Sequence, residues 1–340
     1  MRRTMSFLAL SCFSALAFAN QPIAIVIHGG AGTINKSQMT AAQEQAYHAT
    51  LKHAVETGYA VLAKGGSSVD AVTAAVLVME DSPLFNAGKG AVYTYDEGHE
   101  LDASIMRGDN LMAGAASGLR HVKNPVLLAR AVMEKSEHVM LSGAGAEQFA
   151  KEQGLELVEN AYFDTQFRYE ALKKAKQSMQ KLPHQAQNYR LEAPWQPEWN
   201  MGTVGAVAMD RSGLLTAATS TGGMTAKRYG RIGDAPIIGA GNFADNASCA
   251  VSATGHGEFF IRYRVASDIC ARVKYQGISA DKAADQVMQE LANVGGTGGV
   301  ILIDHKGKVS WSFNTEGMYR ARKTEGEDAV TEIFKQSPAK

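Results

Sequence analysis

The sequence predicts a mixed α+β protein in which antiparallel sheets are covered by helices. Two pairs of β-branched runs are each joined by a short polar turn that contains glycine, as in β-hairpins. The pairs are 204–209 with 214–219, joined by DRSG, and 300–304 with 309–313, joined by HKGK. Helical stretches also follow one another directly, at 41–63 and 69–80. This order differs from the strand–helix–strand alternation that is typical of a parallel sheet.

The first predicted elements follow from residue spacing and capping. A β-branched run at 23–27 predicts a strand, and HGGAG after it predicts a glycine loop. Residues 41–63 have helical periodicity and end at a glycine pair. Ser67 or Ser68 can then cap a second helix at 69–80, because a serine hydroxyl accepts a hydrogen bond from a free backbone N–H of the first turn.

Four further elements are expected before the middle of the chain. They are strands at 91–93 and 101–106 and helices at 126–135 and 143–153. Asn124 followed by Pro125 is typical of a helix start, since proline fits the first helical position.

Residues 180–198 are polar, hold three prolines and have no usable period, so they predict a mobile linker. After the linker come the first hairpin, glycine loops over 222–241 and helices at 258–274 and 281–292.

The overall charge is neutral, with 34 basic and 34 acidic residues among 340, which gives no electrostatic reason to expect nucleic acid as a partner. The N-terminus is typical of an export signal. Arg2 and Arg3 precede an apolar run at 5–18, and an A-x-A pattern ends at Ala19. Cleavage there would leave a chain that begins at Asn20, without a membrane anchor and exported to a compartment such as the periplasm.

Three cysteines are present, and Cys12 lies inside the export signal. A lipid anchor on Cys12 is an alternative that would cut the apolar run in half. Cys249 and Cys270 remain in the mature chain, and the sequence leaves open whether they form a disulfide or stay as buried thiols.

Several common catalytic motifs are absent from the sequence. HGGAG lacks the third glycine of a dinucleotide loop, and no G-x-S-x-G elbow accompanies it. NAGKG is not a phosphate loop, and no H-E-x-x-H exists. Two mature cysteines cannot form a zinc cage.

Gly202 and Thr203 stand where the polar linker meets a buried strand. A threonine hydroxyl becomes a useful nucleophile when a base lies beside it, and its own α-amine can serve if the preceding peptide bond is cut. Glycine before the threonine leaves the carbonyl accessible, and a flexible tract lets the new chain end move away. The pair therefore fits self-cleavage at Gly202–Thr203, although the same residues would also fit an ordinary strand start.

The surrounding motifs strengthen the first interpretation. GTVGAVAMD, ATSTGGMT, GRIGDAPIIGAG and SATGHGEFFIR follow one another over 202–262, with IHGGAG and LFNAGKGAV upstream. From about residue 23 to about 313, the chain resembles the plant-type (type III) asparaginase/isoaspartyl peptidase family of N-terminal nucleophile hydrolases. The resemblance implies a four-layer αββα sandwich made as one self-cleaving precursor. It divides the chain into a signal (1–19), an α subunit (20–202, with a mobile tail from about 180) and a β subunit (203–340) that form one folded domain.

The resemblance also implies roles for individual residues. Thr203 would be the nucleophile and Thr221 would hydrogen-bond its hydroxyl. Arg231 would bind the substrate α-carboxylate and Asp234 its α-ammonium. Thr254 and Gly255 would form an oxyanion hole and contact the substrate. The residues that would support the site and the cleavage geometry are Asn86, Gly29 and Gly30.

No cofactor is expected for the chemistry, but the family holds a structural sodium ion through backbone carbonyls. The matching positions are Met79, Glu80, Ser82, Phe85, Ala87 and Lys89. Two α–β pairs are expected to form a dimer, giving a heterotetramer. The sequence departs from the family pattern at Ala226 and Tyr229, where Asn and Pro are usual, and at His256, where Thr is usual.

The expected activity is hydrolysis of β-aspartyl (isoaspartyl) dipeptides and of L-asparagine, since both present the same α-amino acid head. Glycosylasparaginase activity is an alternative in the same superfamily. An uncleaved exported amino-acid-binding protein is an alternative of another class.

Overall fold

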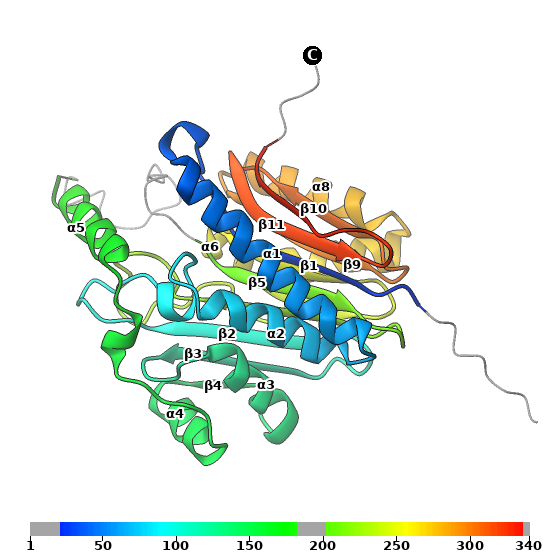
Figure 1. The fold of residues 1–340 in the computed structure, drawn as a ribbon, viewed down its shortest axis with the longest axis horizontal. Helices are drawn as coiled ribbons and strands as arrows, with labels where there is room; N and C mark the ends of the chain where they lie inside the picture. Colours follow the sequence, from blue (N-terminus) through cyan, green and yellow to red (C-terminus); the bar gives the residue numbers. More distant parts are fainter. Residues whose placement is uncertain (1–20, 182–201, 336–340) are drawn as a thin grey trace, which may run out of the picture.

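The computed structural model describes residues 21–181 and 202–335 (Figure 1). The expected export signal and the polar tract at 182–201 lie outside the described residues. Within the described residues the strands form two sheets, and helices pack against both.

The larger sheet has eight strands in the order β12-β11-β1-β5-β6-β2-β3-β4. All neighbours are antiparallel except β3 and β4. The strands are β1 (Ala24–Gly32), β2 (Leu101–Arg107), β3 (Ala113–Leu119), β4 (Met140–Ser142), β5 (Val204–Met209), β6 (Leu215–Thr221), β11 (Gly317–Thr324) and β12 (Val330–Phe334). Because β1 and β5 are neighbours, the segment after the polar tract lies beside the start of the described chain.

The smaller sheet has four antiparallel strands in the order β10-β9-β8-β7. They are β7 (Asn242–Asp245), β8 (Cys249–Gly255), β9 (Gly298–Asp304) and β10 (Val309–Phe313). Apolar side chains of the two sheets form a common core, as where Val26 and Val207 of the larger sheet cluster with Ala250 and Ile301 of the smaller one.

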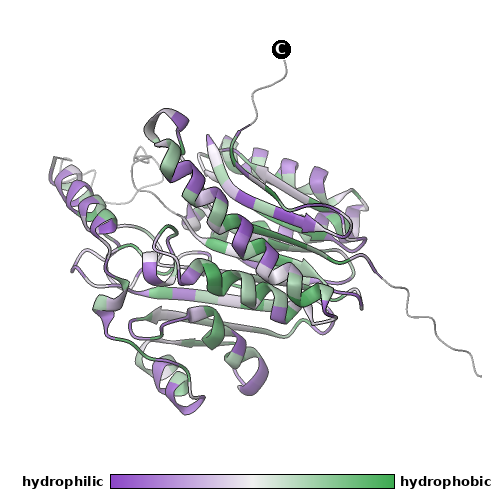
Figure 2. Cartoon of the chain, in the orientation of Figure 1, coloured by the Kyte–Doolittle hydropathy of each residue, from purple (hydrophilic) through white to green (hydrophobic). Residues whose placement is uncertain are grey.

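Helices cover the other faces of the sheets. In Figure 1, α1 and α2 lie along the larger sheet, and their buried side chains share a core with β1 and β5. Helices α7 and α8 share a core with β8 and β9. The helices are α1 (Ala41–Ala63), α2 (Ser68–Glu80), α3 (Pro125–Lys135), α4 (Gly143–Glu152), α5 (Gln166–Lys181), α6 (Gly257–Tyr263), α7 (Val265–Ala271) and α8 (Ala280–Asn293). Figure 2 shows α2 as largely hydrophobic and α5 as mostly hydrophilic, in agreement with the deeper position of α2.

Most elements predicted before the polar tract are confirmed. Helix α1 has the predicted bounds, and Thr40 caps it with Gln43 in a capping box. Ser67 is the N-cap of α2, and Pro125 occupies the first turn of α3. Both predicted hairpins form, as β5–β6 and β9–β10.

Four predictions about elements were wrong. HGGAG is not a loop after a strand but continues β1, which pairs with β11 through an irregularity between His28 and Gly30. Residues 91–93 are not a strand, and residues 180 and 181 belong to α5 rather than to a linker. The helix expected at 258–274 is broken at Arg264, whose φ of 50° is left-handed.

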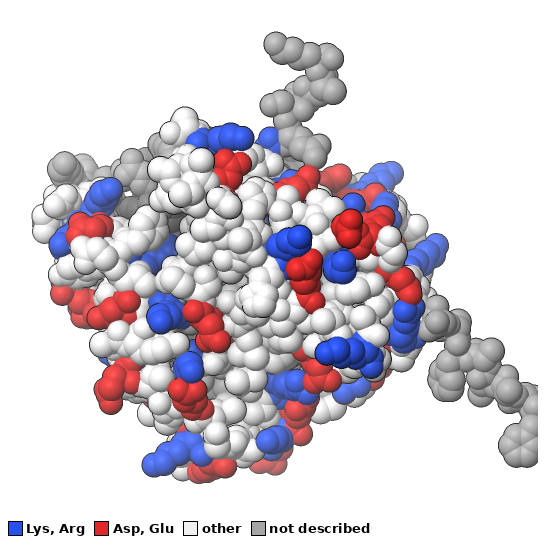
Figure 3. All heavy atoms as spheres, in the orientation of Figure 1, with Lys and Arg blue, Asp and Glu red and all other residues white. Residues whose placement is uncertain are grey.

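The visible face of the molecule carries acidic and basic side chains that are interspersed, as Figure 3 shows. Many charged side chains of the described residues pair at the surface, for example Arg130 with Asp70 at 2.7 Å and Lys308 with Asp281 at 2.7 Å. No helix in the described part of the chain is long and apolar enough to cross a membrane.

Candidate active site

The candidate nucleophile lies at the entrance of strand β5. Val204 pairs with Ser220 of β6, so Thr203 comes opposite Thr221 at the end of that hairpin. The Thr203 hydroxyl donates a hydrogen bond to Thr221 Oγ1 at 3.1 Å, and the Gly223 N–H donates to the same oxygen at 2.9 Å. Thr203 is only 6% exposed. The hydroxyl is therefore fixed in direction before any substrate binds.

His28 is a second partner of Thr203 that the sequence analysis did not single out. Its Nδ1 lies 3.0 Å from the Thr203 carbonyl oxygen and its Nε2 lies 3.0 Å from Ser252 Oγ. Complete burial lowers the pKa of His28 to about 3. The neutral ring must carry its proton on Nδ1, because the carbonyl can only accept. A side chain at Gly205 would begin 2.5 Å from His28 Nε2, so that glycine makes room for the ring.

The backbone around the bond between Gly202 and Thr203 is crowded by Gly30. A Cβ on Gly30 would lie 2.5 Å from Gly202 Cα, and the φ of Gly30 is 111°. Only glycine meets both conditions. A Cβ on Gly202 would lie 3.6 Å from Asn86 Cβ, which is an ordinary contact. The steric demand for glycine therefore falls on Gly30 and not on Gly202.

Asn86 connects the two halves of the site. Its Nδ2 donates to the Gly223 carbonyl at 2.7 Å and its Oδ1 accepts from the Val92 N–H at 2.9 Å. The Gly222 N–H in turn donates to the Asn86 carbonyl. Gly29 lies against Phe85, since a Cβ at Gly29 would meet that ring at 2.4 Å. Asn86 therefore holds the glycines that follow Thr221, whereas Gly29 packs against the residue that precedes Asn86.

Arg231 is held by an ion pair that the sequence analysis did not predict. Its Nε and Nη2 donate to the two carboxylate oxygens of Glu258, each at 3.0 Å. A guanidinium has a second donating edge, formed by Nη1 and Nη2. That edge faces Gly223 and Gly233, because Cβ atoms on these glycines would lie 3.6 and 2.7 Å from Nη1. Arg231 can therefore bind a second carboxylate while Glu258 fixes its orientation.

Asp234 lies beside Arg231 and is fully enclosed. A side chain on Gly257 would begin 2.9 Å from both Arg231 Nη2 and Asp234 Oδ1, so Gly257 keeps the space between them open. Asp234 Oδ2 is buried and has no hydrogen-bond partner among the described residues. Burial raises the pKa of Asp234 to about 7, against the opposing charge of Arg231. An ammonium group is the partner that would restore its charge.

Thr254 and Gly255 end strand β8. Side chains alternate along a strand, so Thr254 points to the same face as Ser252, which contacts His28. Thr254 Oγ1 is buried without a hydrogen-bond partner among the described residues. It is thus a hydroxyl whose donor is available to a ligand.

Of the three departures from the family pattern, His256 contacts the charged groups of this pocket. His256 Nε2 is 3.4 Å from Glu258 Oε2, so it belongs to the same charged cluster as Arg231. Ala226 and Tyr229 both have positive φ, near 60°. Proline cannot adopt such a φ. The change from Pro to Tyr229, which is 97% exposed, therefore alters the backbone as well as the side chain.

The segment after α2 contains the backbone carbonyls that are expected to hold a sodium ion. Cβ atoms on Gly88 and Gly90 would lie 2.2 Å from the Glu80 carbonyl oxygen and 2.0 Å from that of Phe85. Gly88 and Gly90 thus pack against the carbonyl groups of Glu80 and Phe85, which are two of the six expected sodium donors. No group of three or more His, Cys, Asp or Glu in the described residues could hold a metal ion through side chains.

Cys249 and Cys270 form a disulfide between β8 and α7. The sequence left this pairing open, because neither spacing nor composition decides it.

The class of protein that carries this site is identified by comparison with known protein families. The asparaginase family model matches residues 20–333, and the chain belongs to that family. The resemblance seen in the motifs is confirmed.

Named relatives are similar over most of their length. The isoaspartyl peptidase of Escherichia coli (strain K12) is 52% identical over 314 residues, covering 92% of this chain and 96% of the relative. The isoaspartyl peptidase of Salmonella typhimurium is 50% identical over 92% of this chain and 98% of the relative. The isoaspartyl peptidase/L-asparaginase of Xenopus laevis is 42% identical over 86% of this chain and 90% of the relative.

Sequence reasoning missed His28, Glu258 and Gly257 as parts of the site. His28 and Glu258 each adjoin a glycine motif that was recognised, and charged or ring side chains next to such glycines are the signal that was available. Gly257 gives no signal of its own, because its role appears only once Arg231 and Asp234 are seen to face it.

Proposed function

We propose that the protein is a threonine hydrolase that removes the β-acyl substituent of aspartate, acting on isoaspartyl dipeptides and on L-asparagine. The observation that carries the proposal is the Thr203 hydroxyl, buried at the start of a strand and directed by Thr221 at 3.1 Å. The names of the relatives support the same activity.

The enzyme first cleaves itself. Thr203 Oγ1 attacks the Gly202 carbonyl carbon, the peptide C–N bond breaks, and the Thr203 nitrogen takes a proton, leaving an ester that water hydrolyses. His28 holds the Thr203 carbonyl while this happens. The new α-amine, with an ordinary pKa of about 7.7–8, then serves as the base for each turnover.

Substrate hydrolysis uses the same hydroxyl. Arg231 binds the α-carboxylate through its Nη1–Nη2 edge, and Asp234 binds the α-ammonium. Thr203 Oγ1 attacks the side-chain carbonyl, whose oxygen is stabilised by the Thr254 hydroxyl and the Gly255 N–H. The Thr203 amine gives its proton to the departing nitrogen, and water then releases aspartate from the ester.

Further properties belong to the same proposal. The two sheets with helices on their outer faces form the αββα sandwich of N-terminal nucleophile hydrolases. A structural sodium ion binds the carbonyls of the loop after α2, and two α–β pairs form the dimer. The export signal ends at Ala19, and the Cys249–Cys270 disulfide supports export, because disulfides persist in oxidising compartments.

Gel electrophoresis and kinetics test the proposal together. Purified protein is expected to give two chains, 20–202 and 203–340, and to hydrolyse β-aspartyl-leucine and asparagine. Thr203→Ala should give one chain and lower activity by several orders of magnitude, because the nucleophile is removed. Full activity in an intact single chain would refute the mechanism. A glycosylasparaginase would instead require a glycan on the amide, and a binding protein would hydrolyse neither substrate.

A further inference from the structure

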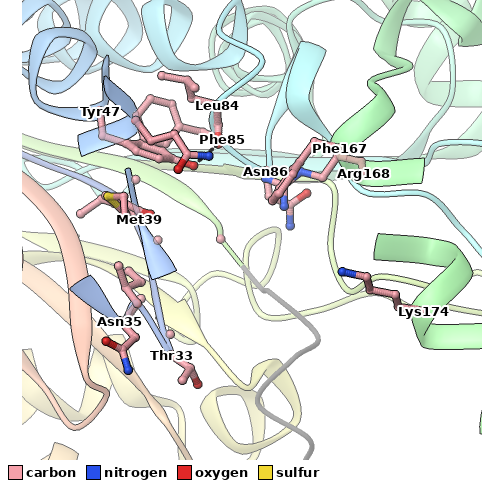
Figure 4. Close-up of a pocket in the computed structure, with 18 residues that line it drawn as sticks. Thr33, Asn35, Met39, Tyr47, Leu84, Phe85, Asn86, Phe167, Arg168 and Lys174 are labelled. Carbon is pink, nitrogen blue, oxygen red and sulfur yellow. Dashed lines mark hydrogen bonds between the residues drawn. The ribbon is translucent and has the colours of Figure 1, made fainter. Parts of the chain in front are cut away.

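A cavity of about 410 Å³ lies against the bond that would be cleaved (Figure 4). Among the residues that line it are Gly30, Asn86 and Gly202, which surround the backbone next to Thr203. Its remaining walls come from β1 and the segment after it, from α1, from the segment after α2, from β11 and from α5. Arg231 and Asp234, which we call the head-group pocket because they would bind the α-amino acid head of the substrate, are not among the residues that line the cavity. The cavity therefore lies on a different side of the site.

The chemistry directs the leaving group toward this cavity. The proton that the departing nitrogen needs comes from the Thr203 α-amine, so that nitrogen must lie within hydrogen-bond reach of the amine. The amine is the nitrogen that was bonded to Gly202, and Gly202 lines the cavity. The part of an isoaspartyl dipeptide that leaves therefore projects into the space beside Gly202.

Two cations line this space, Arg168 and Lys174, and no acidic residue is among the described lining residues. Arg168 is only 5% exposed. Its Nε donates to the Gly90 carbonyl at 2.9 Å, which is a neutral partner. None of the ion pairs among the described residues includes Arg168. A buried guanidinium without a carboxylate is costly, so an anionic ligand would stabilise it.

Lys174 belongs to the same wall but is exposed on helix α5. Figure 4 shows its amine pointing away from the helix into the space between the labelled residues. The neighbouring Lys173 pairs with Glu170 at 3.2 Å and does not line the cavity. The two adjacent lysines of α5 therefore provide a test residue and a matched control.

Aromatic rings form the opposite wall. Tyr47 and Tyr319 stack with centroids 4.2 Å apart, and Phe85 meets Tyr47 edge to face at 5.8 Å. Such a wall suits an apolar side chain, whereas Arg168 and Lys174 suit a carboxylate. The leaving group of an isoaspartyl dipeptide carries both, and the ammonia released from asparagine carries neither.

We propose that Arg168 and Lys174 bind the free α-carboxylate of the amino acid that leaves an isoaspartyl dipeptide, so that this cavity selects dipeptides with a free C-terminus. The proposal rests on the proposed function, because it assigns the second half of that substrate. It makes the C-terminal carboxylate a determinant of specificity that is separate from the α-carboxylate at Arg231.

The test compares β-aspartyl-leucine with its C-terminal amide, which differs only in the carboxylate. For the wild type, kcat/KM should be about tenfold or more higher on the free acid, since a charge-assisted hydrogen bond is lost with the amide. In Arg168→Gln and in Lys174→Gln, the ratio between acid and amide should fall toward one. In Lys173→Gln the ratio should match that of the wild type.

The outcomes distinguish failure of the proposed function from failure of the leaving-group assignment. If wild type hydrolyses neither peptide nor asparagine, the proposed function fails. If it hydrolyses acid and amide equally well, only the leaving-group assignment fails. If Arg168→Gln lowers kcat/KM on acid and amide by the same factor, Arg168 acts only through the Gly90 carbonyl and the inference is wrong for that residue. If Arg168→Gln does not fold or cleave itself, the exposed Lys174→Gln decides, and an unchanged ratio there overturns the proposal.

Discussion

Two arginines with little solvent exposure lie on different sides of the site, and they differ in what already binds them. Arg231 is fixed by both oxygens of Glu258. The partners of Arg168 among the described residues are neutral: the Gly90 carbonyl and the ring of Phe167, whose centroid lies 5.4 Å from the guanidinium carbon. The first arginine keeps one edge for a ligand while a carboxylate neutralises it, whereas the second has no carboxylate partner among the described residues.

Because of this difference, we expect Arg231 and Arg168 to bind a substrate carboxylate in different ways. At Arg231 a second carboxylate enters a place where one negative charge is already present, so binding depends on geometry and on the nearby Asp234 attracting the ammonium. At Arg168 an incoming carboxylate meets two cations, Arg168 and Lys174, and no acidic residue among the described residues that line the cavity. We therefore expect the head-group pocket to select ligands by the shape of an α-amino acid, and the cavity to select ligands by negative charge.

The largest expected effect on this comparison comes from Arg231→Ala. Both substrates share the α-carboxylate, so kcat/KM on β-aspartyl-leucine and on asparagine should fall by about two orders of magnitude or more. Self-cleavage should persist, because it involves no free amino acid. The measurement is steady-state kinetics on protein whose two chains are visible on a denaturing gel.

Arg231→Lys serves as the partner variant. It restores the charge without the planar fork and should recover only part of the loss. Wild-type efficiency in Arg231→Ala on both substrates would mean that the α-carboxylate binds elsewhere, and the contrast with Arg168 would disappear.

Asp234→Asn should have the next largest effect, through pH. The ionised form binds the ammonium, and its pKa is about 7 in the free protein. Wild-type kcat/KM should therefore fall below pH 7 with two overlapping proton uptakes, one at Asp234 and one at the Thr203 amine. In the variant only the amine remains, so the log–log slope should drop from near two toward one. Efficiency at pH 8 should be about ten- to hundredfold lower. A slope unchanged by the substitution would remove Asp234 from substrate binding.

The same carboxyl should affect stability with the opposite sign. Its pKa is raised in the folded state above the unfolded value of about 3.9, so folding favours the protonated form. Its contribution to the free energy of unfolding is present below pH 4 and is lost as the pH rises through 7. Asp234→Asn should therefore raise the Tm relative to wild type at pH 8 and leave it nearly equal at pH 4, which calorimetry without substrate can measure.

The sequence indicated candidate site residues more directly than it indicated several elements of the fold. Thr203, Arg231 and Asp234 lie within motifs whose residue types are typical of a nucleophile, a carboxylate-binding group and an ammonium-binding group. The strands β3 and β8 are rich in Ala, Ser and Gly, so they lack the β-branched alternation that marks a strand. Helix α5 was missed because its polar sequence merges with the tract that follows it. The helix break at Arg264 could not be predicted from the sequence. A residue with left-handed φ is recognisable within a helical pattern only when it is glycine or asparagine.

The contacts between distant segments were equally out of reach. Gly30 meets Gly202 across 172 residues because β1 and β5 are neighbours, and the sequence alone does not give that pairing. Arg168 lay in a segment with no recognised motif, so its place on the cavity wall appeared only with the fold.

The smallest expected effect on activity comes from substitution of Glu258. This residue is the carboxylate partner that Arg231 has and that Arg168 lacks among the described residues. Burial opposes its ionisation, but the hydrogen bonds and charge of Arg231 hold the pKa of Glu258 below its usual value. Glu258→Gln keeps one hydrogen-bond acceptor for Arg231 and removes the negative charge that an incoming α-carboxylate meets. Looser positioning lowers kcat, whereas weaker repulsion lowers KM, so the two changes partly cancel.

We expect Glu258→Gln to lower kcat/KM by about three- to tenfold, mainly through kcat, and Glu258→Ala to lower it further because no acceptor remains. Separate kcat and KM values for both variants on asparagine check this. A rise in kcat/KM in Glu258→Gln would show that Glu258 competes with the substrate rather than positioning Arg231. Arg231 would then resemble Arg168, because it would bind a substrate carboxylate best without a carboxylate partner of its own. The proposed difference between a pocket that selects by shape and a cavity that selects by charge would be refuted.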